Sequence, residues 1–261
     1  MHRPALHFAH ANGFPAPCYG QMLAPLARRY RVGWIEAIGT DPHYPPTEGW
    51  PLLVAQLIET LEREYRGEPV YGVGHSLGAY LNFIAAALRP ELFRGIVMLD
   101  APVIGALRGR ALGAVKRLGI VDRVTPAGMT RERRREWASR EEARAHFRSR
   151  RLFGHFTEEC LEDYVRHGLI GRPGHYRLRI DPEIEYRIYR TIPHDMSRHL
   201  PALRVPAGFA GGTESDVLRR VGLRAMRGAR FRKRRVAGGH LFPFEQPLAA
   251  AAAIEELLGE M

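Results

Sequence analysis

The chain has 261 residues, of which 45% are hydrophobic and 26% charged, and this suits one globular domain that carries an insertion. No apolar run approaches the ~20 residues of a membrane span, and the N-terminus lacks a secretory signal core, so we expect a cytoplasmic protein with no membrane partner. The formal charge of +11 comes mainly from arginines in separate segments with no base-reading module, so we expect no nucleic-acid partner.

Six candidate strands, most of them short apolar runs, alternate with helical patterns along the chain. They are residues 5–9, 31–36, 69–73, 95–99, 207–210 and 231–236, of which the last is the least apolar. Apolar residues recur at helical spacing over residues 50–61, 77–88 and 247–258. This alternation predicts an α/β fold, with a mostly parallel central sheet and helices on both faces.

Residues 103–199 have a different pattern, in which no strand is evident and arginines and aromatic residues interleave. The stretch is too long for a simple connection, so we predict a helical cap inserted into a core formed by residues 1–102 and 200–261. Several cap side chains could line an acyl pocket or meet an anionic leaving group, although cap packing or solvation is the better explanation for any single one of them. These residues are Trp137, Phe147, Phe153, Phe156, Tyr164, Tyr186 and Tyr189, and Arg133, Arg148 and Arg151.

Residues 74–78 read G-H-S-L-G and match the motif G-x-S-x-G between a predicted strand and an amphipathic helix. In this context a serine occupies a sharp strand-to-helix turn, where the glycines let neighbouring backbone approach closely. The pattern predicts Ser76 as a nucleophile. The glycines at residues 72, 74 and 78 do not fit the dinucleotide-binding motif G-x-G-x-x-G, because the third of them is misplaced.

Two loops at the ends of late strands supply candidates for an acid. Asp216 follows the strand at 207–210, and we predict that it orients the catalytic base. The alternative is that Ser215 or Asp216 only caps the next helix. Asp100, directly after the strand at 95–99, is the second candidate, and Glu214 is a weaker third.

His240 lies in a glycine-rich loop after the last predicted strand. It alone among the twelve histidines has both this position and the chain order Ser, Asp, His, so we predict that it is the base. His75 immediately precedes the predicted nucleophile, and we expect it to support the turn rather than take part in the reaction.

The loop after the first predicted strand is the expected source of an oxyanion donor. We predict that the Phe14 N–H acts with the Leu77 N–H, which begins the helix after Ser76. His10, Asn12 and Gly13 would then shape this loop.

Four motifs in order carry a family resemblance: N-G-F-P at 12–15, G-H-S-L-G at 74–78, S-D-V at 215–217 and G-G-H at 238–240. With them the chain resembles the α/β-hydrolase fold superfamily, specifically capped, esterase-like serine hydrolases related to proline iminopeptidases and meta-cleavage hydrolases. In that superfamily a hairpin usually precedes the strand at 5–9, so we expect the hairpin to be missing and the sheet to be shortened.

The resemblance implies a serine hydrolase that cleaves a carboxylic ester by acyl transfer, without a metal or cofactor, and with a small molecule as its partner. A serine at residue 76 argues against dehalogenases and epoxide hydrolases, which use aspartate there. A thioesterase or lactonase with an anionic substrate, bound by the basic cap, is an alternative. A catalytically silent binding module is the non-enzymatic alternative.

Overall fold

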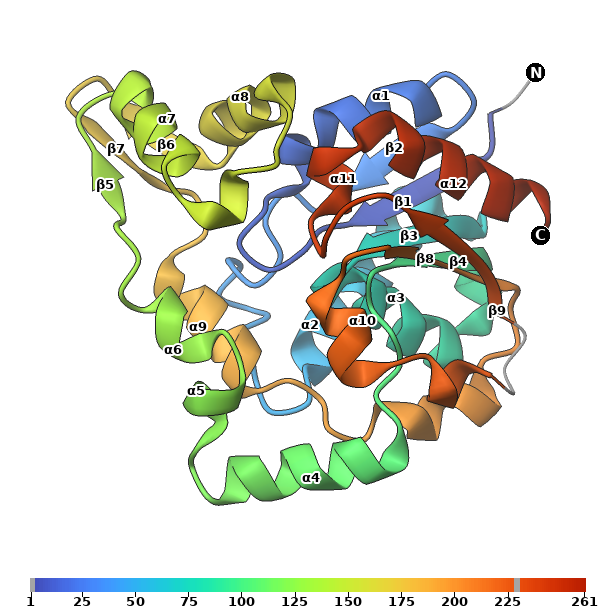
Figure 1. The fold of residues 1–261 in the computed structure, drawn as a ribbon. Coiled ribbons are helices and arrows are strands. Elements are labelled where there is room, and N and C mark those ends of the chain that lie inside the picture. The colour runs from blue at the N-terminus through green and yellow to red at the C-terminus, as the bar shows by residue number, and fades with distance from the viewer. Residues whose placement is uncertain (1–2, 228–230) are drawn as a thin grey trace.

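The computed structural model describes residues 3–227 and 231–261. Its main sheet has six strands in the order β2-β1-β3-β4-β8-β9, and every neighbouring pair is parallel (Figure 1). The strands are β1 (Ala5–Ala9), β2 (Arg31–Trp34), β3 (Val70–His75), β4 (Phe93–Leu99), β8 (Ala207–Gly212) and β9 (Phe231–Val236). All six predicted strands are present, and the second ends two residues earlier than predicted. The α/β fold with a mostly parallel central sheet that the sequence predicts is confirmed.

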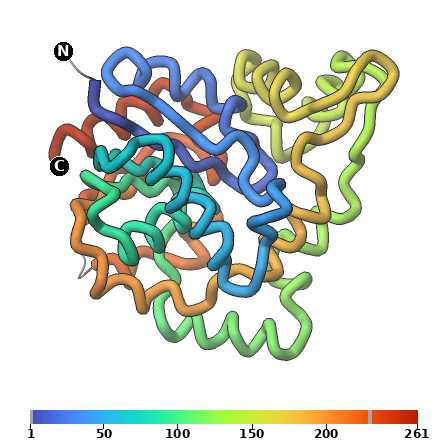
Figure 2. The backbone as a smooth tube through the Cα atoms, turned by 180° about the vertical axis from the view of Figure 1, so that it is seen from behind, coloured from blue at the N-terminus to red at the C-terminus, as the bar shows by residue number. Residues whose placement is uncertain are grey.

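Two apolar clusters cover the two faces of this sheet. Helices α2 (Pro51–Tyr65) and α3 (Leu77–Leu88) pack on one face, whereas α1 (Gly20–Leu26) and α12 (Pro247–Gly259) pack on the other (Figures 1 and 2). β1 is fully buried between these layers, which explains why four of its five residues are apolar. Shorter helical segments complete the core: η1 (Ala16–Tyr19), η2 (Pro90–Leu92), α10 (Asp216–Val221), η5 (Arg224–Met226) and α11 (Phe242–Glu245).

Parallel pairing brings the carboxyl ends of the strands to one edge of the sheet. The loops after β1, β3, β4, β8 and β9 therefore meet there, and they carry every residue that the sequence singled out for catalysis. Within the described residues no antiparallel strand joins the main sheet, and no helix is long and apolar enough to cross a membrane.

The chain leaves the sheet after β4 and returns to it at β8 through a long insertion. Its elements are α4 (Ala106–Arg117), α5 (Val121–Val124), α6 (Ala127–Thr130), β5 (Glu136–Trp137), α7 (Arg140–Arg148), η3 (Arg151–Phe153), α8 (Glu158–His167), β6 (Leu169–Arg172), β7 (His175–Leu178), α9 (Pro182–Arg190) and η4 (Met196–Ala202).

The insertion contains a three-stranded antiparallel sheet, β5-β7-β6, so the prediction that it has no strands is wrong. Residues 173–174 form the turn of the β6–β7 hairpin. These strands are short, and most of their side chains are at least partly exposed, so they lack the apolar runs that marked the strands of the main sheet.

Candidate active site

Ser76 lies in the turn between β3 and α3, with φ 51° and ψ −112°. The Ser76 N–H donates to the Leu99 carbonyl at 3.0 Å, which fixes the turn against β4. A Cβ atom at Gly78 would overlap the backbone of Ala9, and one at Gly74 would overlap Gly78 itself. The glycines of the motif are therefore required by close backbone approach, as the sequence predicted.

His240 lies in the loop between β9 and α11, and its Nε2 is 3.2 Å from Ser76 Oγ. Gly238 precedes it at φ 111°, and the Gly239 N–H donates to the Glu245 carboxylate at 2.8 Å. The His240 side chain is 30% exposed, and Ser76 is half-buried, so solvent reaches this pair. The geometry suits proton transfer from the serine hydroxyl to the imidazole.

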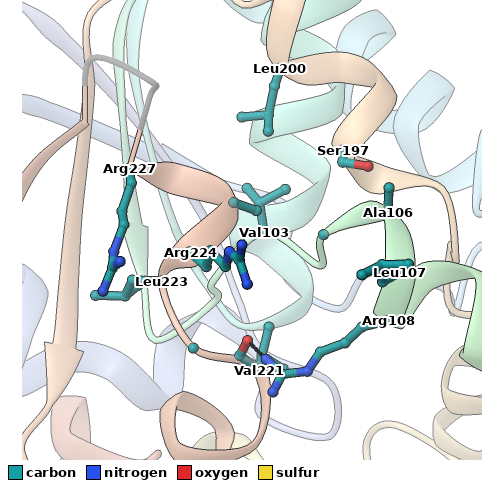
Figure 3. A pocket seen from close by; sticks show the side chains of 13 residues that line it. Val103, Ala106, Leu107, Arg108, Ser197, Leu200, Val221, Leu223, Arg224 and Arg227 are labelled. Carbon is teal, nitrogen blue, oxygen red and sulfur yellow. Dashed lines mark hydrogen bonds between the residues drawn. The ribbon is translucent and has the colours of Figure 1, made fainter.

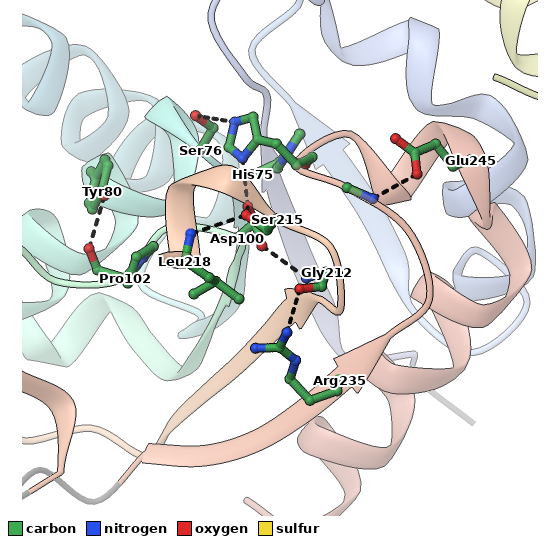
Figure 4. Close-up of polar contacts among 12 residues, drawn as sticks. His75, Ser76, Tyr80, Asp100, Pro102, Gly212, Ser215, Leu218, Arg235 and Glu245 are labelled. Carbon is green, nitrogen blue, oxygen red and sulfur yellow. Dashed lines mark hydrogen bonds and ion pairs between the residues drawn. The ribbon is translucent and has the colours of Figure 1, made fainter. Parts of the chain in front are cut away.

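The carboxylate that orients His240 belongs to Asp100. His240 Nδ1–H donates to Asp100 Oδ2 at 2.6 Å, and the Asp100 side chain is fully buried. The Gly212 N–H donates to Asp100 Oδ1 at 2.9 Å, and the Ser215 hydroxyl donates to Oδ2 (Figure 4). Both oxygens of this buried carboxylate thus have partners, as a buried charge requires.

The prediction that Asp216 contacts His240 is wrong. Asp216 is the first residue of α10, its side chain is 61% exposed, and it forms an ion pair with Arg219. The hydrogen bond from Arg219 lowers the pKa of Asp216. The Ser215 side chain accepts the Leu218 N–H at 3.2 Å, so Ser215 caps this helix, although its hydroxyl also donates to Asp100.

The sequence did hold a signal for Asp100. It directly follows the fully apolar residues 96–99 of β4, so its backbone continues a buried strand. Asp100 has φ 47°, and its N–H donates to the Ala210 carbonyl of the adjacent strand at 2.8 Å. An aspartate that stays buried directly after a buried strand needs polar partners, and the neighbouring loop after β8 provides them.

His75 is fully buried, and its hydrogen bonds link the loop after β1, through Tyr19, to the loop that carries His240. Its Nε2–H donates to the His240 carbonyl at 2.9 Å, so its Nδ1 accepts the Tyr19 hydroxyl at 2.8 Å. Tyr19 in turn accepts the Ala11 N–H at 3.2 Å. Burial lowers the pKa of His75 well below its usual value, which keeps the ring neutral for both hydrogen bonds. His75 therefore supports the turn from behind, as expected.

The loop after β1 forms a β-turn in which the Phe14 N–H donates to the Ala11 carbonyl at 3.1 Å. Gly13, at φ 80°, supplies the positive φ that this turn needs. In this structure the Phe14 N–H, which the sequence predicts as an oxyanion donor, therefore has a turn partner. Leu77 begins α3, so its N–H precedes the helical hydrogen-bond pattern and stays next to Ser76.

Two buried side chains hold the same loop. His10 Nδ1–H donates to the Ala11 carbonyl at 2.8 Å, and its Nε2 accepts the Ile38 N–H at 2.7 Å. Burial lowers the pKa of His10 to about 4. The Asn12 amide donates to the Glu185 carbonyl of α9 at 2.9 Å, so this loop is tied to the insertion.

A family model described as the alpha/beta hydrolase family matches residues 8–254. The chain belongs to the alpha/beta hydrolase family. This is a family of enzymes, as the sequence predicts. The contacts among Ser76, His240 and Asp100 are consistent with hydrolase chemistry.

Related proteins match the chain over shorter stretches. The chain is similar to the monoglyceride lipase homolog of Monkeypox virus, with 27% identity over 86 residues that cover 30% of this chain and 31% of that protein. It is 35% identical to human monoglyceride lipase over 51 residues, which cover 20% of this chain and 17% of that protein. The matched segments thus span less than a third of these relatives.

Solved structures match over the whole chain. The crystal structure of E-2-(acetamidomethylene)succinate hydrolase has a TM-score of 0.76 at 18% identity and covers 99% of this chain and 92% of that chain. At this level of identity the likeness shows the hydrolase fold alone.

In this hydrolase the aromatic residues of the insertion mostly pack against the core. Phe14 lies among Phe153, Phe156, Tyr164 and Phe244, with ring centroids 5.2 to 6.2 Å apart. Trp137 and Phe147 are buried in the same cluster, whereas Tyr189 is only half-buried. Ordinary packing therefore explains most of the predicted pocket aromatics. These contacts hold the insertion against the loop after β1, which contains Phe14.

The arginines proposed for an anionic leaving group are largely paired within the protein. Arg133 donates to both oxygens of the buried Glu185 at 2.7 and 2.6 Å, and Arg148 pairs with Glu158. Arg151 is exposed. Burial raises the pKa of Glu185, which Arg133 counteracts. Among the described residues, no group of three or more metal-ligating side chains is arranged to hold an ion.

Proposed function

We propose that this protein is a serine hydrolase that cleaves a carboxylic ester by acyl transfer, with Ser76 as nucleophile, His240 as base and Asp100 as the acid that orients it. The observation that carries this proposal is the continuous series of contacts from Ser76 Oγ to His240 Nε2 at 3.2 Å and from His240 Nδ1 to Asp100 at 2.6 Å. This sequence of contacts is that of a nucleophile activated by an oriented base.

In the proposed reaction, His240 Nε2 takes the Ser76 proton as Oγ attacks the ester carbonyl carbon. The Leu77 N–H stabilises the oxygen that becomes negative, and removal of one such donor typically costs about 3 kcal/mol of transition-state stabilisation. The Phe14 N–H serves as the second donor only if its turn hydrogen bond to Ala11 opens or is shared. His240 then protonates the leaving alcohol, and water releases the acyl group by the reverse sequence.

Asp100 contributes by keeping Nδ1–H on the side of His240 that faces away from Ser76. Its negative charge also stabilises the imidazolium that forms during attack. Because Asp100 is fully buried, water screens this interaction little. The hydrogen bonds from Gly212 and Ser215 hold the carboxylate in place while it does so.

An ester is the favoured substrate class for two reasons. A monoglyceride, the substrate in the names of two relatives, is itself a carboxylic ester. The thioesterase or lactonase alternative relied on a basic cap that meets an anionic substrate, yet Arg133 and Arg148 are already paired with glutamates. We propose a small-molecule substrate that does not have to carry a negative charge.

The test compares the wild type with Ser76→Ala for labelling by a fluorophosphonate probe and for hydrolysis of short and medium nitrophenyl esters. We expect Ser76→Ala to lose labelling completely and ester turnover by at least about 10⁴-fold. Ser149→Ala, at an exposed serine of the insertion, is the matched control and should behave as the wild type.

The result that overturns the proposal is a folded wild type that neither reacts with the probe nor hydrolyses any ester, which would favour the silent binding module. Probe labelling that persists in Ser76→Ala would place the nucleophile elsewhere. Preference for thioesters over matched oxygen esters would overturn the substrate class while keeping the nucleophile.

A further inference from the structure

Helix α4 packs on the rest of the protein through glycines. A Cβ atom at Gly113 would lie 2.9 Å from the imidazole of His194, and one at Gly109 would overlap the His194 carbonyl. Both glycines are buried, and they lie four residues apart on one face of the helix. Close contact at these two glycines therefore defines much of the inward face of α4, beside Leu112, which packs against the core.

The outward face of the same helix is apolar. Leu107, Ala111, Ala114 and Leu118 are all exposed, and their spacing of four, three and four residues places them in one stripe. The exposed fractions of Leu107 and Leu118 are 78% and 72%. A surface helix normally turns such a stripe toward the core, so α4 shows the reverse of the usual arrangement.

Exposed apolar side chains are concentrated around this helix. Of the eight large hydrophobic residues that are exposed in the described part of the chain, four lie between residues 107 and 129. Besides Leu107 and Leu118 they are Val124 and Met129. An open groove of about 770 Å³ also lies between α4 and the end of α10, and Leu107, Val221 and Leu223 are among the residues that line it (Figure 3). The apolar area thus extends beyond α4 itself.

Basic side chains flank the apolar stripe. Residues 105–129 contain five basic residues and a single acidic one, Asp122, which already contacts Arg190 and the Tyr186 hydroxyl. In the described residues Arg110 and Arg117 pair with no carboxylate, unlike Arg144 and Arg148 of α7. Arg224 and Arg227 add further charge at the groove (Figure 3).

We propose that the α4 face docks onto the surface of an anionic lipid bilayer. The α4 face is the stripe of Leu107, Ala111, Ala114 and Leu118 with the flanking Arg108, Arg110 and Arg117. Leucines at the centre of a basic rim match an interface in which apolar side chains enter the acyl boundary while arginines meet anionic headgroups.

The same features argue against other occupants. A nucleic acid offers phosphates but no apolar layer for the leucines to enter. A second copy of this chain would bring one basic rim against an identical one, because a two-fold contact pairs a surface with itself. The expectation of no membrane partner rested on the lack of a spanning segment, whereas a helix that lies on a surface needs only one apolar face.

The test is cosedimentation of the full-length protein with phosphatidylcholine vesicles that do or do not contain phosphatidylglycerol. We expect binding only to the anionic vesicles, and weaker binding as salt is added. The double variant Leu107→Gln/Leu118→Gln should bind at least about tenfold more weakly, because glutamine keeps the helix but removes the apolar stripe. Arg110→Gln and Arg117→Gln should each weaken binding about fivefold.

Leu248→Gln and Arg28→Gln are the matched controls, because Leu248 is 68% exposed on α12 and Arg28 is exposed after α1, both far from α4 in Figure 1. Thermal melts should show that all variants are folded. The test measures binding to vesicles and therefore does not depend on catalytic activity. The proposal is overturned by equal binding to both vesicle types, or by leucine variants that bind like the wild type. A dimer in solution that Leu118→Gln dissociates would also overturn it in favour of self-association.

Discussion

The loops after β4 and β8 lie side by side at the carboxyl edge of the sheet, and each carries an aspartate, yet only one aspartate reaches His240. Asp100 after β4 is fully buried and accepts hydrogen bonds from three groups. Asp216 after β8 has a side chain that is 61% exposed and pairs with Arg219. The two loops also cooperate, since Ser215 and Gly212 of the β8 loop hold the carboxylate of the β4 loop.

This difference indicates that burial, rather than order along the chain, determines which of the two aspartates contacts His240. A carboxylate in water interacts weakly with an imidazolium because the solvent screens the charges, whereas a buried one interacts much more strongly. Asp216 gains its own stabilisation from the N-terminus of α10 and from Arg219, and neither contact points toward Ser76.

Replacement of each aspartate by asparagine gives the largest expected contrast. Asp100→Asn should lower kcat by about 10³- to 10⁴-fold, because the amide cannot enforce the Nδ1–H tautomer of His240 or stabilise its charged form. Asp216→Asn should leave kcat within about twofold of the wild type, because an exposed ion pair contributes little. Steady-state hydrolysis of a nitrophenyl ester measures both effects.

Thermal melts and KM separate a chemical effect from unfolding in these variants. Asp100→Asn should keep KM and a cooperative melt while kcat falls. A loss of kcat in Asp216→Asn that matched the loss in Asp100→Asn would reverse the assignment and restore the prediction made from the sequence.

The sequence predicted the central strands of the main sheet well because β1, β3, β4 and β8 are almost entirely buried. Such burial on both faces favours short, mostly apolar runs such as residues 95–99. Ser76 was predictable for a similar reason, because the spacing of Gly74 and Gly78 reflects a backbone clash that any larger residue would cause.

Both candidate acids follow neighbouring strands, so the position of Asp100 directly after a buried strand favoured it without excluding Asp216. The deciding facts are side-chain directions: Asp100 turns inward at φ 47°, and Asp216 is carried outward as the first residue of a helix. The three strands of the insertion were missed because their stability depends on pairing between distant segments, such as Glu136 with Arg177, rather than on local pattern.

Burial should also affect histidines, through the pH dependence of stability. Burial lowers the pKa of His7 to about 4, whereas an unfolded chain has a histidine pKa near 6.5. Between these values the unfolded state binds more protons, so the free energy of unfolding should fall as pH falls, by up to about 3 kcal/mol for such a histidine. This stability is present above about pH 6.5 and is fully lost below about pH 4.

Urea denaturation at several pH values between about 7 and about 4.5 measures this dependence. His7→Phe is the informative variant, because His7 lies in β1 and contacts Tyr65 rather than Ser76. We expect the variant to lose less stability than the wild type over this range. Parallel curves for the two proteins would contradict the view that His7 stays neutral because it is buried.

Replacement of Ser215 should have a smaller effect on kcat than replacement of Asp100, and this effect should be selective because the Ser215 hydroxyl has two roles. It caps α10 by accepting the Leu218 N–H, and it donates to Asp100. Ser139 caps α7 by accepting the Glu142 N–H at 3.1 Å and lies in the insertion, away from Asp100. Alanine at either position should lower the free energy of unfolding by about 1 kcal/mol through loss of a cap.

Only Ser215→Ala should also lower kcat, by roughly tenfold with KM unchanged, because a buried carboxylate loses one of its hydrogen bonds and holds His240 less firmly. Chemical denaturation and steady-state kinetics on both variants separate the two roles. If the two variants lost stability equally and neither lost kcat, Ser215 would be a helix cap alone, and the β4 loop would position Asp100 without help from its neighbour.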